Sequence, residues 1–320
     1  MTASPRIFIA LCAVLLIATR ASATGNTCDR ACLDGMVDSY LAALIAHDPS
    51  RLPLTPDAKF TENTVRMKPG EGVWKTATGI GSFKIHVDDP QAGQTVFIGV
   101  LKEGGKATMF VTRLKVESQR ISEVETIIAR SGLGGEWDLV PATLVAARPT
   151  FTQTLAASER SPRDKMIAIA NSYYEGIERG TGDITPFADD CARFENGVLL
   201  TSNPSFHFAL MSPSGKQPPN IAAMGCKAQF DTHFWATDFI DHRRFPVVDE
   251  ERGLVTAFST YEAHGTRECA DVVGFGKVCP AGKVSPVTLD LAETFRITNG
   301  KIHEMESVWT VLPYRTQPGW

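Results

Sequence analysis

The sequence predicts an α+β fold that is built twice in tandem. Two observations predict it. Two pairs of matching segments recur along the chain, and in each copy one amphipathic helix precedes a run of β-type segments. A helix followed by a long antiparallel meander is typical of α+β architecture, whereas alternating βαβ units would indicate a parallel sheet. We therefore expect two domains of the same type.

The first 23 residues predict a secretory signal peptide. Arg6 precedes the apolar run "IFIALCAVLLIA", and the small-residue pattern "ASA" lies directly before Thr24. This run is too short to span a bilayer, and no later segment has the roughly 18 consecutive apolar residues that a membrane helix needs. We expect a mature protein that is secreted or periplasmic and that does not associate with a membrane after the signal is removed.

The cysteine content predicts a disulfide framework. One of the seven cysteines, Cys12, lies in the predicted leader, and an even number in an oxidising compartment favours disulfides. A zinc site is the weaker interpretation, because no CxxC pair or HExxH motif is present, and we expect no metal. Other connectivities remain open, but the spacings favour three local pairs: Cys28 with Cys32, Cys191 with Cys226, and Cys269 with Cys279.

The overall charge argues against nucleic acid as a partner. The formal net charge is -4 and the isoelectric point is about 6.0, without a basic stripe. We expect a small-molecule partner, and either a homodimer or an intramolecular pseudo-dimer.

The internal repeat divides the chain. "RISEVET" at 120–126 matches "KIHEMES" at 301–307 at a spacing of 181 residues, whereas an upstream block containing Glu62-Asn63 matches Glu195-Asn196 at a spacing of 133. The difference implies that the second copy carries about 48 extra residues, within 199–290. We predict a signal peptide at 1–23, a first domain at 24–150 and a second domain with an insertion at 151–320.

The elements follow the same order in both copies. Amphipathic helices are predicted at 32–48 and 164–180, and each is followed by a proline-bearing link and a short strand that carries the Glu-Asn pair. Turns such as "KEGGK" and "TNGK" join the later strands into hairpins. These strands are predicted at 94–101, 107–117 and 121–129, and at 253–263, 287–298 and 301–312.

A helix, a strand of the type "TPDAKFTEN" and a closing hairpin of the type "FRITNGKIHEMESVW" resemble the NTF2-like superfamily, which includes SnoaL-like and ketosteroid-isomerase-like proteins. The resemblance covers nearly all of the mature chain, as two copies. It implies two tandem cone-shaped domains, each a curved antiparallel sheet wrapped on helices around a pocket. Members include cofactor-free isomerases, dehydratases and lyases as well as proteins that only bind or assemble, so the fold does not fix the function.

The repeated strand places Glu123 and Glu125 on one face, because alternate residues of a strand share a face. The pair could be an acid/base couple that lines a pocket. We favour the other interpretation, in which the two carboxylates lie on the solvated side of a half-buried sheet.

Both Glu-Asn pairs are candidate site residues. In Glu195-Asn196 the carboxylate could abstract a proton while the amide orients a substrate oxygen. The alternative is a polar bulge whose side chains cap neighbouring backbone groups. The matched residues Tyr40 and Tyr173 could donate to an oxyanion, or they could be core aromatics.

The second copy is chemically richer than the first, because it adds a cluster of histidines and acidic residues. His264 is a candidate for proton transfer near neutral pH. Nucleophilic serine chemistry and phosphate binding find no support, since GxSxG and P-loop motifs are absent.

We therefore expect a cofactor-independent acid/base enzyme, a lyase, dehydratase or isomerase, that acts on a small aromatic or polycyclic metabolite in a hydrophobic pocket. The alternative is a non-catalytic secreted module for small-molecule binding or assembly. The candidate base is Glu195 or His264, and Tyr173 with Asn196 would stabilise charge on oxygen. Two further catalytic candidates are His233 and Asp238. The candidate substrate-binding residues are Tyr40, Glu62, Asn63, Trp74, Trp235, Tyr261 and Trp309.

Overall fold

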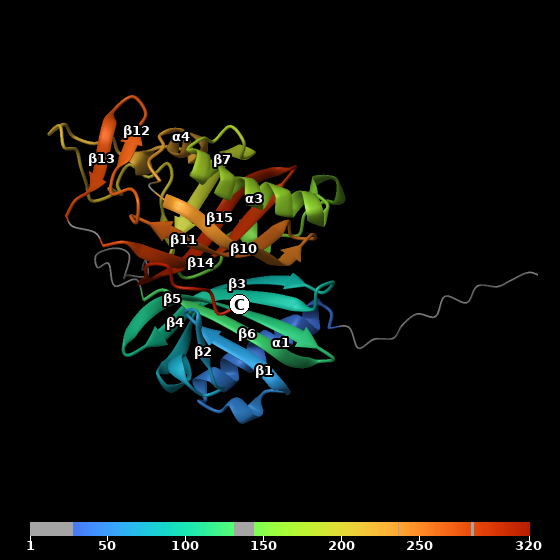
Figure 1. The fold of residues 1–320 in the computed structure, drawn as a ribbon. Helices are drawn as coiled ribbons and strands as arrows, with labels where there is room; N and C mark the ends of the chain where they lie inside the picture. Colours follow the sequence, from blue (N-terminus) through green and yellow to red (C-terminus); the bar gives the residue numbers. More distant parts are fainter. Residues whose placement is uncertain (1–27, 131–143, 236, 283–284) are drawn as a thin grey trace, which may run out of the picture.

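The computed structural model describes residues 28–130, 144–235, 237–282 and 285–320, so the predicted signal peptide lies outside the described residues. We call residues 28–130 the first half and residues 144–320 the second half (Figure 1). The first half contains α1 (Arg30–Ile45), η1 (Pro49–Arg51), β1 (Leu54–Glu62), β2 (Val65–Met67), η2 (Gly72–Lys75), β3 (Ala77–Asp89), β4 (Gln94–Glu103), β5 (Lys106–Glu117) and β6 (Arg120–Ile128). The second half contains α2 (Pro149–Thr152), η4 (Ala157–Glu159), α3 (Arg163–Arg179), β7 (Phe187–Glu195), β8 (Val198–Leu199), β9 (Leu210–Met211), η5 (Ile221–Ala223), α4 (Cys226–Asp231), β10 (Thr237–Asp249), β11 (Leu254–Ala263), β12 (Ala270–Val272), β13 (Gly276–Pro280), β14 (Val287–Thr298) and β15 (Lys301–Pro313).

The two halves have the same sheet topology. The order of one six-stranded sheet is β2-β1-β6-β5-β4-β3, and the order of the other, read from the matching edge, is β8-β7-β15-β14-β11-β10. Both sheets are mixed rather than antiparallel throughout, because β1 runs parallel to β6 and β7 runs parallel to β15. The predicted duplication therefore appears as a repeated layout that is mostly β, with few helices.

The predicted helices and hairpin strands are present, but sequence patterning missed the long edge strands β3 and β10. Both have register shifts against their neighbours, which interrupt the alternation of apolar and polar residues. In β10 the run Asp241–Arg244 also looks like a polar loop. The register shifts, and the charged residues of β10, therefore obscured the strand pattern in the sequence.

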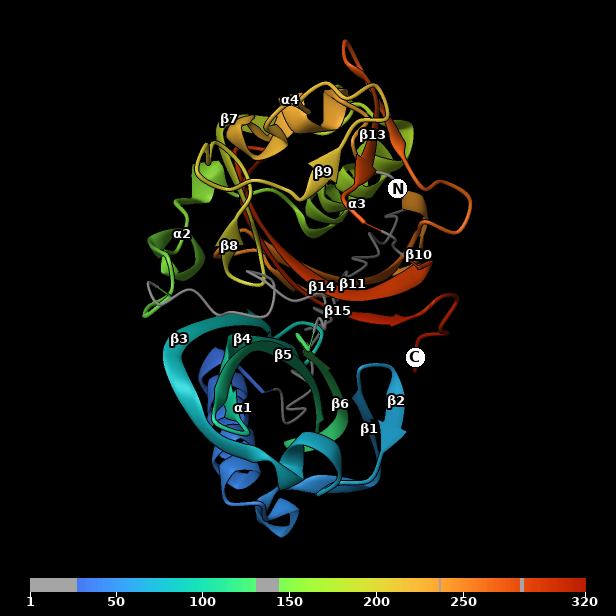
Figure 2. The same cartoon turned by 90° about the vertical axis from the view of Figure 1, so that its left-hand side faces the viewer.

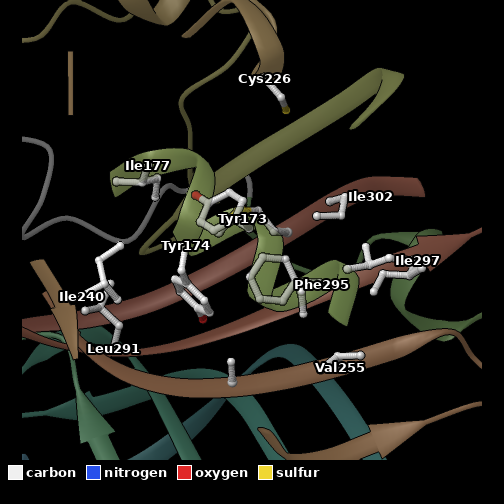
Figure 3. Close-up of a cluster of buried hydrophobic side chains, with 14 of the residues drawn as sticks. Tyr173, Tyr174, Ile177, Cys226, Ile240, Val255, Leu291, Phe295, Ile297 and Ile302 are labelled. Atoms are coloured by element: carbon white, nitrogen blue, oxygen red, sulfur yellow. The ribbon is translucent and has the colours of Figure 1, made fainter. Parts of the chain in front are cut away.

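Each long helix packs on the inner, concave face of its own sheet. The buried face of α1 includes Val37, Tyr40 and Leu44. In the second half, α3 points Tyr173 and Tyr174 toward the sheet, where Phe295 of β14 meets them (Figure 3). Each half thus has its own core between helix and sheet.

The outer, convex faces of the two sheets pack against each other. One apolar cluster joins both halves: residues such as Ile98 and Val111 of the first half meet Phe258 and Val308 of the second. Figure 2 shows the sheets back to back, each curving away from the other around its own helix. Packing of this kind excludes water from both convex faces.

Two reciprocal ion pairs flank this apolar contact. Arg30 begins α1 and binds Asp249 of the second half at 2.7 Å, whereas Arg163 begins α3 and binds Asp89 of the first half at 2.6 Å. Both aspartates are buried. The two halves therefore exchange equivalent contacts, as the two sides of an isologous interface do.

The repeated glutamates lie on the outer faces of the two sheets, so neither interpretation from the sequence describes them fully. Glu125 lies on the outer face of β6 and pairs with Arg244 of the second half. The matching Glu306 is fully buried on the outer face of β15, where Arg148 binds it at 2.7 Å. Glu125 lines a hollow of only about 10 Å³ together with Asp290 and Trp320, and both carboxylates are buried. Only Glu123 is partly exposed.

The three predicted disulfides are confirmed. Cys28–Cys32 lies at the start of α1, Cys191–Cys226 ties α4 to β7, and Cys269–Cys279 closes the β12–β13 hairpin. No helix in the described part of the chain is long and apolar enough to cross a membrane.

The extra residues of the second half form two excursions, one between β8 and β10 and the other between β11 and β14. Together they contribute α4 and a small sheet of order β12-β13-β9. We call these two excursions the insertion. In Figure 2 the insertion lies over the concave side of the second sheet, together with α3.

We predict that Arg30→Met lowers the free energy of unfolding by about 3 kcal/mol, because it leaves the Asp249 carboxylate buried without its partner. The measurement is urea unfolding followed by circular dichroism. The double variant Arg30→Met/Asp249→Asn should recover about half of the loss. A loss no larger than that of Arg66→Met, an exposed arginine on β2, would contradict a role for the reciprocal pairs in stability.

Candidate functional site

The second half encloses a cavity of about 320 Å³. Its walls come from α3, from the inner face of the sheet and from the insertion, which supplies Phe208, Leu210, Phe234 and Trp235. Most of the lining is apolar, and a few polar side chains converge on it. A largely apolar hollow with a few placed polar groups is the usual form of a small-molecule site.

Arg193 is the buried cation of this cavity, and its side chain is only 2% exposed. Its Nε donates to the Tyr173 hydroxyl at 2.9 Å, Nη1 donates to Gln229 at 2.6 Å, and Nη2 donates to Glu195 at 3.0 Å. The guanidinium also stacks over the Trp235 ring at 4.4 Å. These contacts use three of its five N–H groups and hold the charge in place.

Glu195 is held by two donors. Arg193 binds one carboxylate oxygen, and the Trp309 indole N–H donates to the other at 3.2 Å. Burial raises the pKa of Glu195, while the Arg193 charge and the Trp309 hydrogen bond oppose that rise. Glu195 therefore has a stabilising partner for its ionised form.

Glu293 has no cationic partner among the groups that bond to it. It lies on the inner face of β14, is 2% exposed and accepts a hydrogen bond from the Tyr261 hydroxyl at 3.0 Å. Burial raises the pKa of Glu293 to about 7, against the lowering effect of the Tyr174 and Tyr261 hydroxyls. A carboxyl group with this pKa can both take and return a proton near neutral pH.

Tyr173 connects Arg193 to the cavity. Its hydroxyl oxygen accepts the Arg193 Nε–H, so its own proton remains available to a group in the cavity. Burial raises the pKa of Tyr173, and the Arg193 charge only partly offsets this. Tyr173 therefore stays protonated and can act as a hydrogen-bond donor.

The cavity is lined by six of the residues selected from the sequence: Tyr173, Glu195, Trp235, Tyr261, His264 and Trp309. Trp235 adds a buried indole N–H without a hydrogen-bond partner in the described part of the chain. His264 lies half-buried, and its Nδ1 is 3.3 Å from the Arg267 carbonyl oxygen.

Asn196 is buried but does not line the cavity, because both of its side-chain atoms bond to the backbone of Trp309. Asn63 makes the same two bonds to Ile128. Both asparagines have positive φ, at 47° and 45°, in the turns that follow β7 and β1. Each Glu-Asn pair thus lies at a hairpin turn, where the Asn side-chain amide bonds to the backbone of the neighbouring strand. This agrees closely with the interpretation as a polar bulge whose side chains cap backbone groups.

His233 and Asp238 also lie outside the cavity lining. His233 is exposed and contacts Gly180 at the end of α3. Asp238 accepts hydrogen bonds from Gly265, Thr266 and Tyr314, which lower its pKa although partial burial raises it. It fixes the loop that follows β11.

The first half has no comparable cavity. Tyr40, Glu62 and Trp74 line a hollow of only about 10 Å³. The Tyr40 and Trp74 rings pack edge to face at 5.5 Å. The Glu62 carboxylate accepts hydrogen bonds from the Val73 amide and from Arg130. These side chains fill the core of the first half at the place that matches the cavity of the second.

The repeat explains this difference. At the spacing of 133, Phe60 occupies the place of Arg193, and at the spacing of 181, Thr112 occupies the place of Glu293. On the neighbouring strands, Thr112 pairs with Phe97 whereas Glu293 pairs with the smaller Ala257. Sequence analysis selected neither Arg193 nor Glu293. Both could have been found by comparing the two copies, because each is a charged residue at a position where the first copy has an uncharged one.

The described residues contain no group of three or more His, Cys, Asp or Glu side chains arranged to hold a metal ion.

A family model described as "Domain of unknown function (DUF8021)" matches residues 26–128 and 159–309, which is most of the chain. The chain belongs to this family. The two matched ranges coincide closely with the two halves of the structure. No curated protein sequence matches the chain.

Several solved structures are similar to part of the chain. A de novo designed protein with a curved β-sheet is 17% identical, with a TM-score of 0.27, over 32% of this chain and 88% of that one. A protein of unknown function with a cystatin-like fold from Methylobium petroleophilum PM1 is 14% identical, with a TM-score of 0.28, over 34% and 82%. A candidate SnoaL-like polyketide cyclase from Shewanella denitrificans OS-217 is 20% identical, with a TM-score of 0.24, over 30% and 88%. TM-scores this low support no conclusion about activity.

We predict that the ionisation of Glu293 destabilises the fold. Its pKa is about 7 when folded and 4.5 in the reference state, so the folded state binds more protons between these values and loses stability as the pH rises from about 4.5 to about 7. Above pH 7 the cost is about 3 kcal/mol. In urea unfolding at pH 8, Glu293→Gln should therefore be more stable than the native protein, and at pH 4 this gain should be absent. A gain that does not depend on pH, or an equal gain in the exposed control Glu268→Gln, would contradict the assignment.

Proposed function

We propose that the cavity of the second half is the active site of a cofactor-independent acid/base enzyme, of the lyase, dehydratase or isomerase type. Its substrate would be a small aromatic or polycyclic metabolite. The observation that carries the proposal is Glu293, a buried carboxyl group with a pKa of about 7 on the wall of an apolar cavity.

Glu293 replaces Glu195 and His264 as the proposed base. Glu195 bonds to Arg193 and Trp309, which both stabilise its ionised form. His264 is only half-buried and follows the end of β11. Two carboxyl groups with different partners in one cavity are the arrangement by which enzymes separate the roles of an acidic pair. Glu195 would remain ionised and orient Arg193, and Glu293 would exchange the proton.

The proposed step is proton abstraction from a carbon next to a carbonyl group. Glu293 takes the proton, the C–H electron pair forms a C=C bond, and the carbonyl π electrons move to oxygen. The Tyr173 hydroxyl donates to that oxygen, with Arg193 polarising the hydroxyl through its Nε–H. Protonation at another carbon then completes an isomerisation, whereas departure of a β-substituent completes an elimination.

The proposed substrate class follows from the residues that line the cavity. Apolar side chains such as Leu289 and Leu291 and aromatic rings such as Trp235 and Trp309 line the cavity. These surfaces favour a flat, mostly apolar ring system. In this proposal the few polar groups bind a single carbonyl or hydroxyl group.

The same proposal assigns each half to the NTF2-like superfamily, as a curved sheet with a helix on its concave face. The fold topology and the inner cores support it. The halves would form an intramolecular pseudo-dimer in which the filled first half supports the second. We also propose that the protein is secreted or periplasmic, a location in which its three disulfides would be stable.

The test is to incubate a metabolite extract of the host's culture medium with the mature protein and to follow all masses over time by mass spectrometry. A new mass should grow with time and far exceed the amount of protein. The rate should fall about 100-fold in Glu293→Gln, because that variant cannot accept a proton. The exposed control Glu268→Gln should retain the native rate.

Product formation that persists in Glu293→Gln would contradict the role of this residue. A metabolite that is depleted only in proportion to the protein, equally by all three proteins, would identify a binding module instead of an enzyme.

A further inference from the structure

The insertion contains a second hollow beside the main cavity. We call it the outer hollow. Its volume is about 170 Å³, and it is lined by His207, Phe208, Leu210, Asn220, Ile221 and the segment 217–219. Phe208 and Leu210 line both hollows, so the two hollows meet at these residues.

The chain at this junction is held in place. Leu210 and Met211 of β9 pair with Pro280 and Cys279 of β13, and Cys279 is joined to Cys269 by a disulfide. The Phe208 ring packs on Phe234 at 5.3 Å and on Trp235 at 6.0 Å, both of which line the main cavity. The residues that the two hollows share therefore have a fixed position.

The outer hollow differs from the main cavity in its chemistry. Its polar groups are an imidazole, from His207, and two amides, from Gln217 and Asn220, and no Asp, Glu, Lys or Arg lines it. Asn220 is engaged with Pro204 and Ala222, whereas His207 and Gln217 are exposed. An imidazole and amides, which offer both donors and acceptors, suit hydroxyl groups. Phe208 and the two prolines, Pro218 and Pro219, add an apolar surface on which the face of a sugar ring could lie.

We propose that the ligand has two parts: a flat ring system in the main cavity and an uncharged, hydroxyl-rich extension such as a sugar in the outer hollow. His207 and Gln217 bind the hydroxyl groups, and Phe208 marks the junction between the two parts. This inference rests on the proposed function, since it takes the main cavity as the site for the ring.

Three related compounds test the proposal by isothermal titration calorimetry: 4-methylumbelliferone, its β-D-glucoside and its phosphate ester. The first is a fused ring with a carbonyl group, the second adds a neutral sugar and the third adds a charge. The native protein should bind the glucoside at least tenfold more tightly than the free ring, and the phosphate should gain no such advantage. In His207→Ala/Gln217→Ala the advantage of the glucoside should fall to less than threefold. Lys216→Ala, an exposed neighbour that does not line the hollow, should keep it.

The outcomes separate the two proposals. Equal binding of the free ring and the glucoside, or an advantage that survives the double substitution, would overturn the outer subsite and leave the main cavity as a ring site. A preference for the phosphate would overturn the neutral chemistry assigned to the outer hollow. Absence of binding by all three compounds would contradict both the ring site and the extension that depends on it.

Discussion

The packing of the two convex sheet faces is the contact on which the rest of the molecule depends. It buries apolar side chains of both sheets, and the exchanged pairs of Arg30 with Asp249 and Arg163 with Asp89 fix its register at the two helix starts. Because the two convex faces pack on each other, each long helix lies on a concave face, and so does the insertion of the second half. Of the duplicated glutamates, Glu125 pairs with Arg244 across the interface, whereas Glu306 binds Arg148 within the second half.

The two concave faces then diverge through a few substitutions of size and charge. Phe60 and Phe97 fill the first half, whereas Arg193 and Ala257 stand at the matching places of the second. The insertion completes the second cavity and is tied to the sheet by the Cys191–Cys226 disulfide. The cavity, the buried Arg193 and the carboxyl groups of Glu195 and Glu293 therefore occur together in the second half of the duplicated fold. This asymmetry supports the proposal that the duplicated chain has a single active site, in its second half.

The fold could be predicted from the sequence further than the site. Local patterns in the sequence predicted the repeat, the two long helices, the hairpin strands and the three disulfides. The edge strand β10 was not predicted, because bulges and its charged residues break the alternation. The parallel pairing of β1 with β6 was missed because it is a non-local contact. Arg193 and Glu293 were missed because neither recurs in the first copy, where Phe60 and Thr112 occupy the matching places, whereas the Glu195-Asn196 pair was selected because it matches Glu62-Asn63.

The most direct test of the account is the titration of Glu293 itself. ¹³C NMR spectra of protein labelled at the glutamate carboxyl carbon, recorded from pH 4 to pH 9, would resolve the individual carboxyl groups. The signal that is missing in Glu293→Gln belongs to this residue. The account predicts that its pKa is about 7, set by burial against neutral tyrosine partners. A pKa near the ordinary value of 4.5 would mean that the carboxylate is well stabilised in the cavity, and it would remove the proposed base.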